Sequence, residues 1–396
     1  MSNAPSPSMS PISSDYVLSE ASQRSGGASD FGGPEFMASL GRLVDSLNSE
    51  AQLNELGQLI ASERLIGHAL NRLLYIRDRK NNPSIADEKI VKPVFIVGMP
   101  RTGTTILHDI LAQDPASRAP LTWELTFPSP PPEKASFRTD PRIAQCEALF
   151  PDIDAQIPGF KAMHPMGAEL TQECVMLMAD TLCSSLFHNQ FRVPTFQDYI
   201  DGPDAPWKEV YQFHKEQLQH LQWRCKGDRW VLKTGAHLWS LEYLLEQYPD
   251  ARIVFNHRDP VKSMTSYASL TRLVRTMSMD HVDPVEIASD WVPRLCKALH
   301  HALDVRTQGN YPQAKFYEMY FDDFSRDQFE QVEKVYEAFE IPMSGEAADR
   351  MRKFIAENPK GVHGEHVYRE EDYGINPEEI REMFSRYIAH FDLRAE

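Results

Sequence analysis

The sequence predicts an α/β protein in which a P-loop-like parallel sheet is flanked by helices. Three observations predict this class: short apolar runs bounded by turn residues, helical patterns between those runs, and a glycine-containing loop directly after the first run. The expected strands lie at residues 94–97, 230–233, 253–257 and 315–320, and the expected helices at 104–113, 238–247, 260–270 and 328–339. Such alternation is typical of a parallel sheet that is covered on both faces.

The composition is that of a globular protein with an excess of acidic residues. The 396 residues include 41 Lys and Arg against 57 Asp and Glu, which gives a formal net charge of −16. This balance argues against a protein that grips nucleic acid or an anionic membrane through bulk charge. Five scattered cysteines form no C-x-x-C pair, and no run of about 18 apolar residues occurs. We therefore expect a cytoplasmic protein without a transmembrane segment.

The N-terminal region divides into a polar tail and a helical extension. Half of residues 1–36 are Ser, Gly or Pro, so we expect a disordered tail here, and its end (32–36) is typical of an expression-vector remnant. Residues 37–396 then form a single α/β domain. Within 37–92, apolar residues return at helical spacing from Leu40 onward, which predicts two or three packed helices.

A long insertion separates the first two expected strands. Residues 120–225 hold a proline-rich loop and an expected Met-rich helix from Glu169 to Phe187, and we interpret this insertion as a helical cap on the sheet. Glu169 and Glu173 are four residues apart, so on such a helix they share one face. Both carboxylates are candidates for a catalytic base if the cap covers the site.

The loop after the first strand has the layout of a phosphate-binding turn. It runs from Gly98 to Gly103 and opens a helix at Thr104, so that backbone N–H groups can hold an anion. A Walker A loop carries Lys immediately after its second Gly, but Thr104 stands there. The basic residue lies inside the loop instead, as Arg101. An ATP-dependent kinase is therefore an alternative that this loop does not favour.

The segment from Pro100 to Thr105 resembles the phosphosulfate loop of the sulfotransferases that use 3′-phosphoadenosine 5′-phosphosulfate (PAPS), in their bacterial form. The resemblance implies that the 5′-phosphosulfate is held by this loop, namely by Pro100, Arg101, Thr102, Gly103, Thr104 and Thr105. In that family a strand ends in Arg, and a Ser eight residues later helps to bind the 3′-phosphate. Arg258 and Ser266 stand at this spacing.

Two looser matches extend the resemblance toward the C-terminus. Phe321 lies near the aromatic position that packs on the adenine in the family, and Lys360 with Gly361 resembles the loop that closes over the nucleotide. No group of His, Cys, Asp or Glu has metal-ligand spacing, so we expect no required metal.

The family places a Lys-Thr-His stretch at the end of a middle strand, where the His acts as the base. Here the stretch runs Lys233-Thr234-Gly235-Ala236-His237, with two extra residues before the His. The resemblance implies that His237 is the base and that Lys233, beside Arg101, neutralises the leaving oxygen. Glu173 and Glu169 stay open as rival bases.

Together these features predict an enzyme that transfers a sulfuryl group from PAPS to a hydroxyl and releases adenosine 3′,5′-bisphosphate (PAP). We expect a hydrophobic small-molecule or lipid acceptor because the insertion is rich in aromatic residues: Trp123, Phe127, Phe187, Phe191 and Tyr199. The alternatives are an ATP-dependent P-loop kinase and a non-catalytic nucleotide-binding protein.

Overall fold

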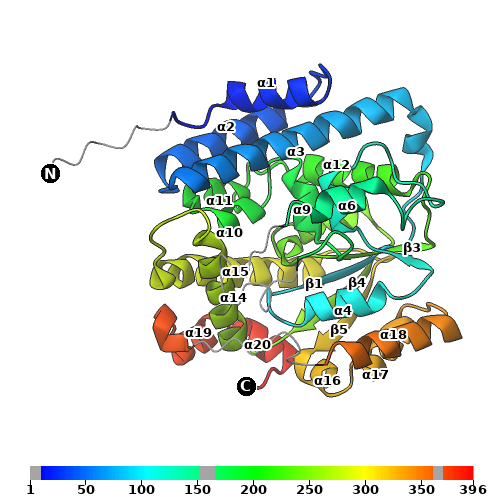
Figure 1. Cartoon of the computed structure of the whole chain (residues 1–396). Helices are drawn as coiled ribbons and strands as arrows, with labels where there is room; N and C mark the ends of the chain where they lie inside the picture. Colours follow the sequence, from blue (N-terminus) through cyan, green and yellow to red (C-terminus); the bar gives the residue numbers. More distant parts are fainter. Residues whose placement is uncertain (1–9, 151–165, 360–368, 396) are drawn as a thin grey trace.

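The computed structural model describes residues 10–150, 166–359 and 369–395, and its centre is a five-stranded parallel sheet (Figure 1). The strands are β1 (Val94–Gly98), β2 (Ser117–Arg118), β3 (Arg229–Lys233), β4 (Arg252–His257) and β5 (Lys315–Tyr320). They pair in the order β2-β3-β1-β4-β5. The predicted α/β class and the four predicted strands are confirmed. The sequence missed β2 because its two residues, Ser117 and Arg118, form no apolar run.

Helices cover both faces of the sheet because side chains alternate along each strand. Val94 and Ile96 of β1 pack in one core with helices α4 (Thr104–Leu111), α17 (Gln328–Ala338) and α18 (Gly345–Glu357). Phe95 and Val97 belong to the other core. That core contains the helices α12 (Trp207–Gln222), α13 (Leu241–Gln247), α14 (Pro260–Arg275) and α15 (Pro284–Gln308).

The strand register brings the ends of three strands to one edge of the sheet. Ile96 pairs with Lys233, and Gly98 pairs with Asn256, one residue before the end of β4. The loops after β1, β3 and β4 therefore leave the sheet side by side. In open parallel sheets this carboxyl edge is where ligands bind.

The N-terminal region is helical over more of its length than the sequence predicted. Helix α1 (Ser14–Arg24) buries Val17 and Ala21 and packs on α3 (Glu55–Asn81), while α2 (Pro34–Ser49) buries Phe36. The prediction of a disordered tail is therefore wrong for these residues, because a few apolar side chains at helical spacing suffice when a neighbouring helix covers them. Residues 1–9 lie outside the described residues. The prediction of packed helices after residue 37 is confirmed by α2 and α3, which lie across the top of Figure 1.

The described part of the insertion is mainly helical, as predicted. Its helices are α5 (Thr122–Thr126), α6 (Pro141–Glu147), α9 (Cys174–Ala179), α10 (Leu186–Gln190), α11 (Pro194–Ile200) and α12. The single helix expected from Glu169 to Phe187 is wrong, because Leu182 has a left-handed backbone (φ 55°) that separates α9 from α10. Upstream, Thr171 bridges to Leu121 in an extended conformation. Glu169 and Glu173 therefore do not share a helical face.

The remaining helices are short. They are η1 (Pro83–Asp87), η2 (Gly235–Trp239), α16 (Phe321–Arg326), η3 (Glu370–Tyr373), α19 (Pro377–Met383) and α20 (Ser385–Phe391). In the part of the chain that the structure describes, no helix is both long and apolar enough to cross a bilayer.

Candidate active site

The loop between β1 and α4 is held tightly against β4. At Gly98 (φ 152°) a Cβ would lie 2.6 Å from the carbonyl oxygen of Asn256, so only glycine fits this approach. The Asn256 side-chain amide donates to the Thr102 carbonyl oxygen over 3.1 Å, and the Thr102 hydroxyl donates to the Met99 carbonyl oxygen over 2.8 Å. Sequence reasoning missed Asn256, although its place at the end of a strand was a usable signal. These contacts fix a loop whose last residue, Gly103, begins helix α4 and leaves its first N–H groups available to an anion.

Arg101 joins this loop to the start of α14. Its backbone is left-handed (φ 67°), and its Nε donates to Ser266 Oγ over 3.0 Å. Arg258, which directly follows β4, donates from its guanidinium to the Arg101 carbonyl oxygen over 2.8 Å. The structure thus brings together three residues that the sequence assigned to two separate anion sites.

Phe321 completes this side of the site. It is the first residue after β5, and the Arg258 guanidinium lies over its ring at 3.8 Å from the centroid. A Cβ at Gly103 would come within 3.3 Å of the same ring. The aromatic side chain predicted to contact the nucleotide therefore lies against the loop and the arginine.

A second cluster forms where β3 ends and α9 begins. The Lys233 ammonium is buried and donates to the Glu173 carboxylate over 2.5 Å and to the Thr105 hydroxyl over 3.2 Å. Glu173 is the residue that precedes α9, and its side chain is 35% exposed. A partly exposed carboxylate, a buried cation and a hydroxyl of the loop helix thus meet at the carboxyl edge of the sheet.

His237 lies apart from this cluster. Its side chain is completely buried in η2, against the rings of Phe95 and Tyr211. Its Nδ1 is 2.7 Å from the Tyr211 hydroxyl, and its Nε2 has no hydrogen-bond partner in the described part of the chain. Burial lowers the pKa of His237 well below its usual range, and the neighbouring His214 lowers this pKa further. The imidazole is therefore neutral and shielded by aromatic rings.

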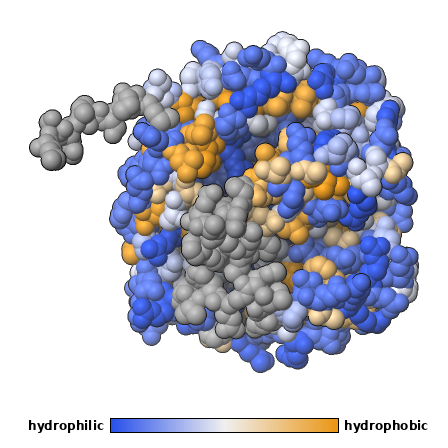
Figure 2. All heavy atoms as spheres, viewed as in Figure 1, coloured by the Kyte–Doolittle hydropathy of each residue, from blue (hydrophilic) through white to orange (hydrophobic). Residues whose placement is uncertain are grey.

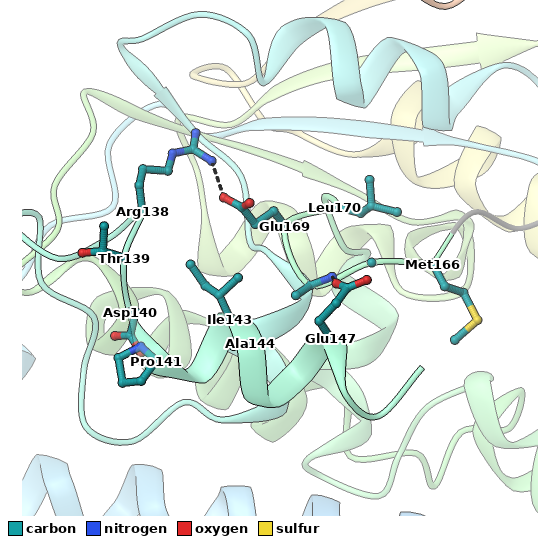
Figure 3. Close-up of a pocket in the computed structure, with 12 residues that line it drawn as sticks. Arg138, Thr139, Asp140, Pro141, Ile143, Ala144, Glu147, Met166, Glu169 and Leu170 are labelled. Carbon is teal, nitrogen blue, oxygen red and sulfur yellow. Dashed lines mark hydrogen bonds and ion pairs between the residues drawn. The ribbon is translucent and has the colours of Figure 1, made fainter. Parts of the chain in front are cut away.

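Glu169 lines an open pocket of about 630 Å³ between α6 and the segment that leads to α9 (Figure 3). Its carboxylate pairs with the Arg138 guanidinium over 3.0 Å, and both side chains are at least half exposed. Apolar side chains of Ile143, Met166 and Leu170 also line this pocket. Glu169 is thus an exposed ion-pair partner, four residues before the carboxylate that contacts Lys233.

Several of the predicted aromatic residues do not reach the site. Trp123, Phe187 and Phe191 are fully buried core side chains, so the aromatic richness of the insertion reflects packing more than an acceptor wall. Lys360 and Gly361 lie outside the described residues. Within residues 10–150, 166–359 and 369–395, no three His, Cys, Asp or Glu side chains gather as metal ligands would.

The parallel sheet, with helices on both faces and a glycine-bounded loop at its carboxyl edge, is the α/β fold of a transferase. The sulfotransferase family model matches residues 93–345, and the chain belongs to this family. Two solved structures are similar over nearly the whole chain. Sulfotransferase STF1 from Mycobacterium tuberculosis is 29% identical with a TM-score of 0.84, over 96% of this chain and 100% of that one. Sulfotransferase STF9 from Mycobacterium avium is 26% identical with a TM-score of 0.89, over 99% and 100%.

A third similar protein is named for the substrate on which it acts. It is the omega-hydroxy-beta-dihydromenaquinone-9 sulfotransferase Stf3 of Mycobacterium tuberculosis, which is 23% identical over 304 residues. The match covers 74% of this chain and 74% of Stf3. The family and the mycobacterial neighbours confirm the predicted bacterial sulfotransferase.

Proposed function

We propose that this sulfotransferase uses PAPS as its donor and transfers the sulfuryl group to the hydroxyl of a hydrophobic acceptor. The observation that carries the proposal is the junction of Arg101, Ser266 and Arg258. Arg101 belongs to a loop that presents backbone N–H groups, and it contacts both Ser266 and Arg258. PAPS carries one phosphate group at the 5′ position and another at the 3′ position of its ribose, so it needs two neighbouring anion sites of this kind.

The donor fits the residues present. The loop from Pro100 to Thr105 would hold the 5′-phosphosulfate, since Gly98 allows the loop to lie tightly against β4 and α4 points its first N–H groups there. Arg258 and Ser266 would hold the 3′-phosphate, because a guanidinium offers two parallel N–H donors to a phosphate. Phe321, stacked under Arg258, would face the adenosine.

The transfer itself needs few protein groups. The acceptor oxygen forms a bond to sulfur while the bond from sulfur to the 5′-phosphate oxygen breaks, and the hydroxyl proton must go to a base. Glu173 is the base we propose, because its carboxylate is partly exposed beside the loop. Lys233 and Arg101 would balance the charge that develops on the leaving oxygen.

The burial of His237 supports this assignment over the one implied by the family stretch. A general base must come within hydrogen-bond reach of the proton it removes. The His237 ring is covered by Phe95 and Tyr211, and its Nδ1 already contacts the Tyr211 hydroxyl. The Glu173 carboxylate is partly exposed, so an acceptor could approach it without a rearrangement of the core.

A hydrophobic acceptor is supported by two observations. Stf3, whose name gives a hydroxylated menaquinone derivative as its substrate, matches three quarters of this chain. In addition, the pocket beside the segment that ends at Glu173 has apolar lining from Ile143, Met166 and Leu170. Figure 2 shows apolar residues on this face near α6 and α11, with a hollow between them.

Ligand-dependent thermal stability tests the choice of donor before the acceptor is known. A ligand that binds only the folded state raises the melting temperature. We expect PAP to raise it more than ATP with Mg²⁺ at equal concentration, and transfer from labelled PAPS to a long-chain alcohol to survive EDTA. A larger shift with ATP and Mg²⁺, or a strict need for Mg²⁺ in turnover, would point to a kinase instead.

A further inference from the structure

A buried chain of hydrogen bonds connects the C-terminal helix α20 to His257, the residue directly before Arg258. The Tyr387 hydroxyl of α20 lies 3.0 Å from Nδ1 of His257, the last residue of β4, and Arg258 is the next residue along the chain. On its other side, His257 Nε2 is 2.7 Å from the Glu318 carboxylate of β5. Arg306 of α15 pairs with the same carboxylate. Four elements of the fold therefore converge on the residue that precedes Arg258.

Each group in this chain of hydrogen bonds donates a hydrogen bond to the next, from Tyr387 to His257 and from His257 to Glu318. Burial raises the pKa of Tyr387, so its hydroxyl keeps its proton and can donate to His257 Nδ1. Burial lowers the pKa of His257 despite Glu318, which leaves a neutral ring with its proton on Nε2. Burial also acts to raise the pKa of Glu318, but the hydrogen bonds from His257 and Arg306 outweigh it, and the group stays ionised. The Tyr387 hydroxyl, both His257 ring nitrogens and the Glu318 carboxylate thus each have a matched partner.

Packing holds the chain in place. Tyr387 and His257 are both completely buried, and the His257 ring stacks on Phe391 with centroids 3.9 Å apart. Neither side chain is exposed to solvent. Their connection to the site runs through the main chain of Arg258.

We propose that Tyr387 and His257 are positioning residues that fix the main chain of Arg258 and so aim its guanidinium at the 3′-phosphate. This inference rests on the proposed function, in which Arg258 binds that phosphate. The Arg258 guanidinium contacts the Arg101 carbonyl oxygen and the Phe321 ring. The hydrogen bonds of Tyr387 and His257 hold the main chain directly before it. The C-terminal helix is then part of the selectivity for the donor, although it contacts no ligand.

The substitution Tyr387→Phe tests this role because it removes the hydroxyl and keeps the ring. Its affinity for PAP should fall about fivefold to tenfold, in line with one weakened charged hydrogen bond, while its affinity for AMP, which lacks the 3′-phosphate, should change less than about twofold. The measurement is calorimetric titration of both nucleotides into the full chain. The readout is the ratio of the two affinities, which a general loss of stability does not move.

A matched control is Tyr336→Phe. Tyr336 is also buried, and its hydroxyl donates to Asp114 over 2.8 Å in the core on the other face of the sheet. This variant should lose stability but keep the wild-type ratio. A second pair guards against poor folding of Tyr387→Phe: His257→Asn retains an acceptor near the position of Nδ1 and should keep more of the PAP preference than His257→Leu.

The outcomes separate this inference from the function beneath it. If the wild-type protein does not prefer PAP to AMP, the proposed donor is wrong. If the wild type prefers PAP, and both Tyr387→Phe and His257→Leu keep the full preference, the positioning role of Tyr387 and His257 is wrong, while the proposal of PAPS as the donor is retained.

Discussion

The donor side and the acceptor side of this site are assembled in different ways. On the donor side, the strand β1 with its loop carries Arg101, and β4 with α14 carries both Arg258 and Ser266. On the acceptor side, Glu173 comes from the insertion and reaches Lys233, which is 60 residues further along the chain. The donor side is thus specified by two short segments of the sequence. The acceptor side depends on how the long insertion packs against the end of β3.

This difference explains what each side can tolerate. The donor side is held by the backbone, through the close approach of Gly98 to Asn256 and the left-handed conformation of Arg101. On the acceptor side, the buried Lys233 forms an ion pair with the partly exposed Glu173 and a hydrogen bond with the Thr105 hydroxyl. Substitutions on the donor side should therefore change binding, and those on the acceptor side should change chemistry.

The largest effect should follow from Glu173→Gln. A general base contributes on the order of 10²–10⁴ in rate, so kcat should fall by that factor while donor affinity changes little. Steady-state turnover with a hydrophobic alcohol and PAPS measures this. Glu169→Gln is the matched control, because Glu169 is exposed and pairs only with Arg138 among the ion pairs of the described residues.

The same experiment can reverse the assignment of the base. If Glu173→Gln keeps the wild-type rate, and His237→Gln loses activity without a change in melting temperature, the imidazole must reach the cleft and Glu173 is a partner of Lys233 alone.

A smaller effect is expected for Arg101→Ala. A hydrogen bond from a charged group to a phosphate contributes about 1.5–3 kcal/mol, so affinity for PAP should fall at least about tenfold. Arg138→Ala removes an exposed arginine that pairs with Glu169 at the pocket, and it should leave PAP affinity unchanged. Calorimetric titration of both variants checks the difference, and equal affinities would remove Arg101 from the donor site.

The smallest effect is on stability and concerns the buried His214, whose ring lies beside that of His237. Burial lowers the pKa of His214 from 6.5 to about 3, so the folded state stays neutral while the unfolded state takes up a proton. Stability is therefore lost as the pH falls from about 6.5 toward about 3, and near pH 5.5 the cost from this group is about 1 kcal/mol. His214→Asn, which keeps an acceptor for the Tyr248 hydroxyl, should lose that much less stability between pH 7 and 5.5. Denaturant unfolding at the two pH values measures it, and identical losses would mean that His214 is not shielded from water.

The sequence predicted the donor side well because its determinants are local. Two glycines, one arginine and a helix start within eight residues specify the loop, and four apolar runs specify most of the sheet. The acceptor side could not be predicted in this way. Whether His237 faces a cleft or a core depends on Phe95 and Tyr211, which come from β1 and α12. The break between α9 and α10 likewise lies at Leu182, whose residue type gives no sign of a left-handed backbone.

The N-terminal helix teaches a related lesson. It lies within residues 1–36, whose content of Ser, Gly and Pro predicts disorder, yet Val17 and Ala21 are four residues apart and α1 packs on α3. Arg24 also pairs with Glu63 of α3 over 2.7 Å. Packing against α3 thus stabilises a helix in a segment whose own composition predicts disorder.

The preference for PAP over AMP tests the assignment of the donor most directly. AMP and PAP share the 5′-phosphate, so only the position held by Arg258 and Ser266 distinguishes them. A hydrogen bond from a charged group to a phosphate contributes about 1.5–3 kcal/mol, so calorimetric titration of the wild-type protein should show PAP binding at least about tenfold more tightly than AMP. The double variant Arg258→Ala with Ser266→Ala should bring PAP affinity down toward that of AMP and leave AMP binding nearly unchanged. Equal affinities for the two nucleotides in the wild-type protein would contradict the PAPS-dependent reaction.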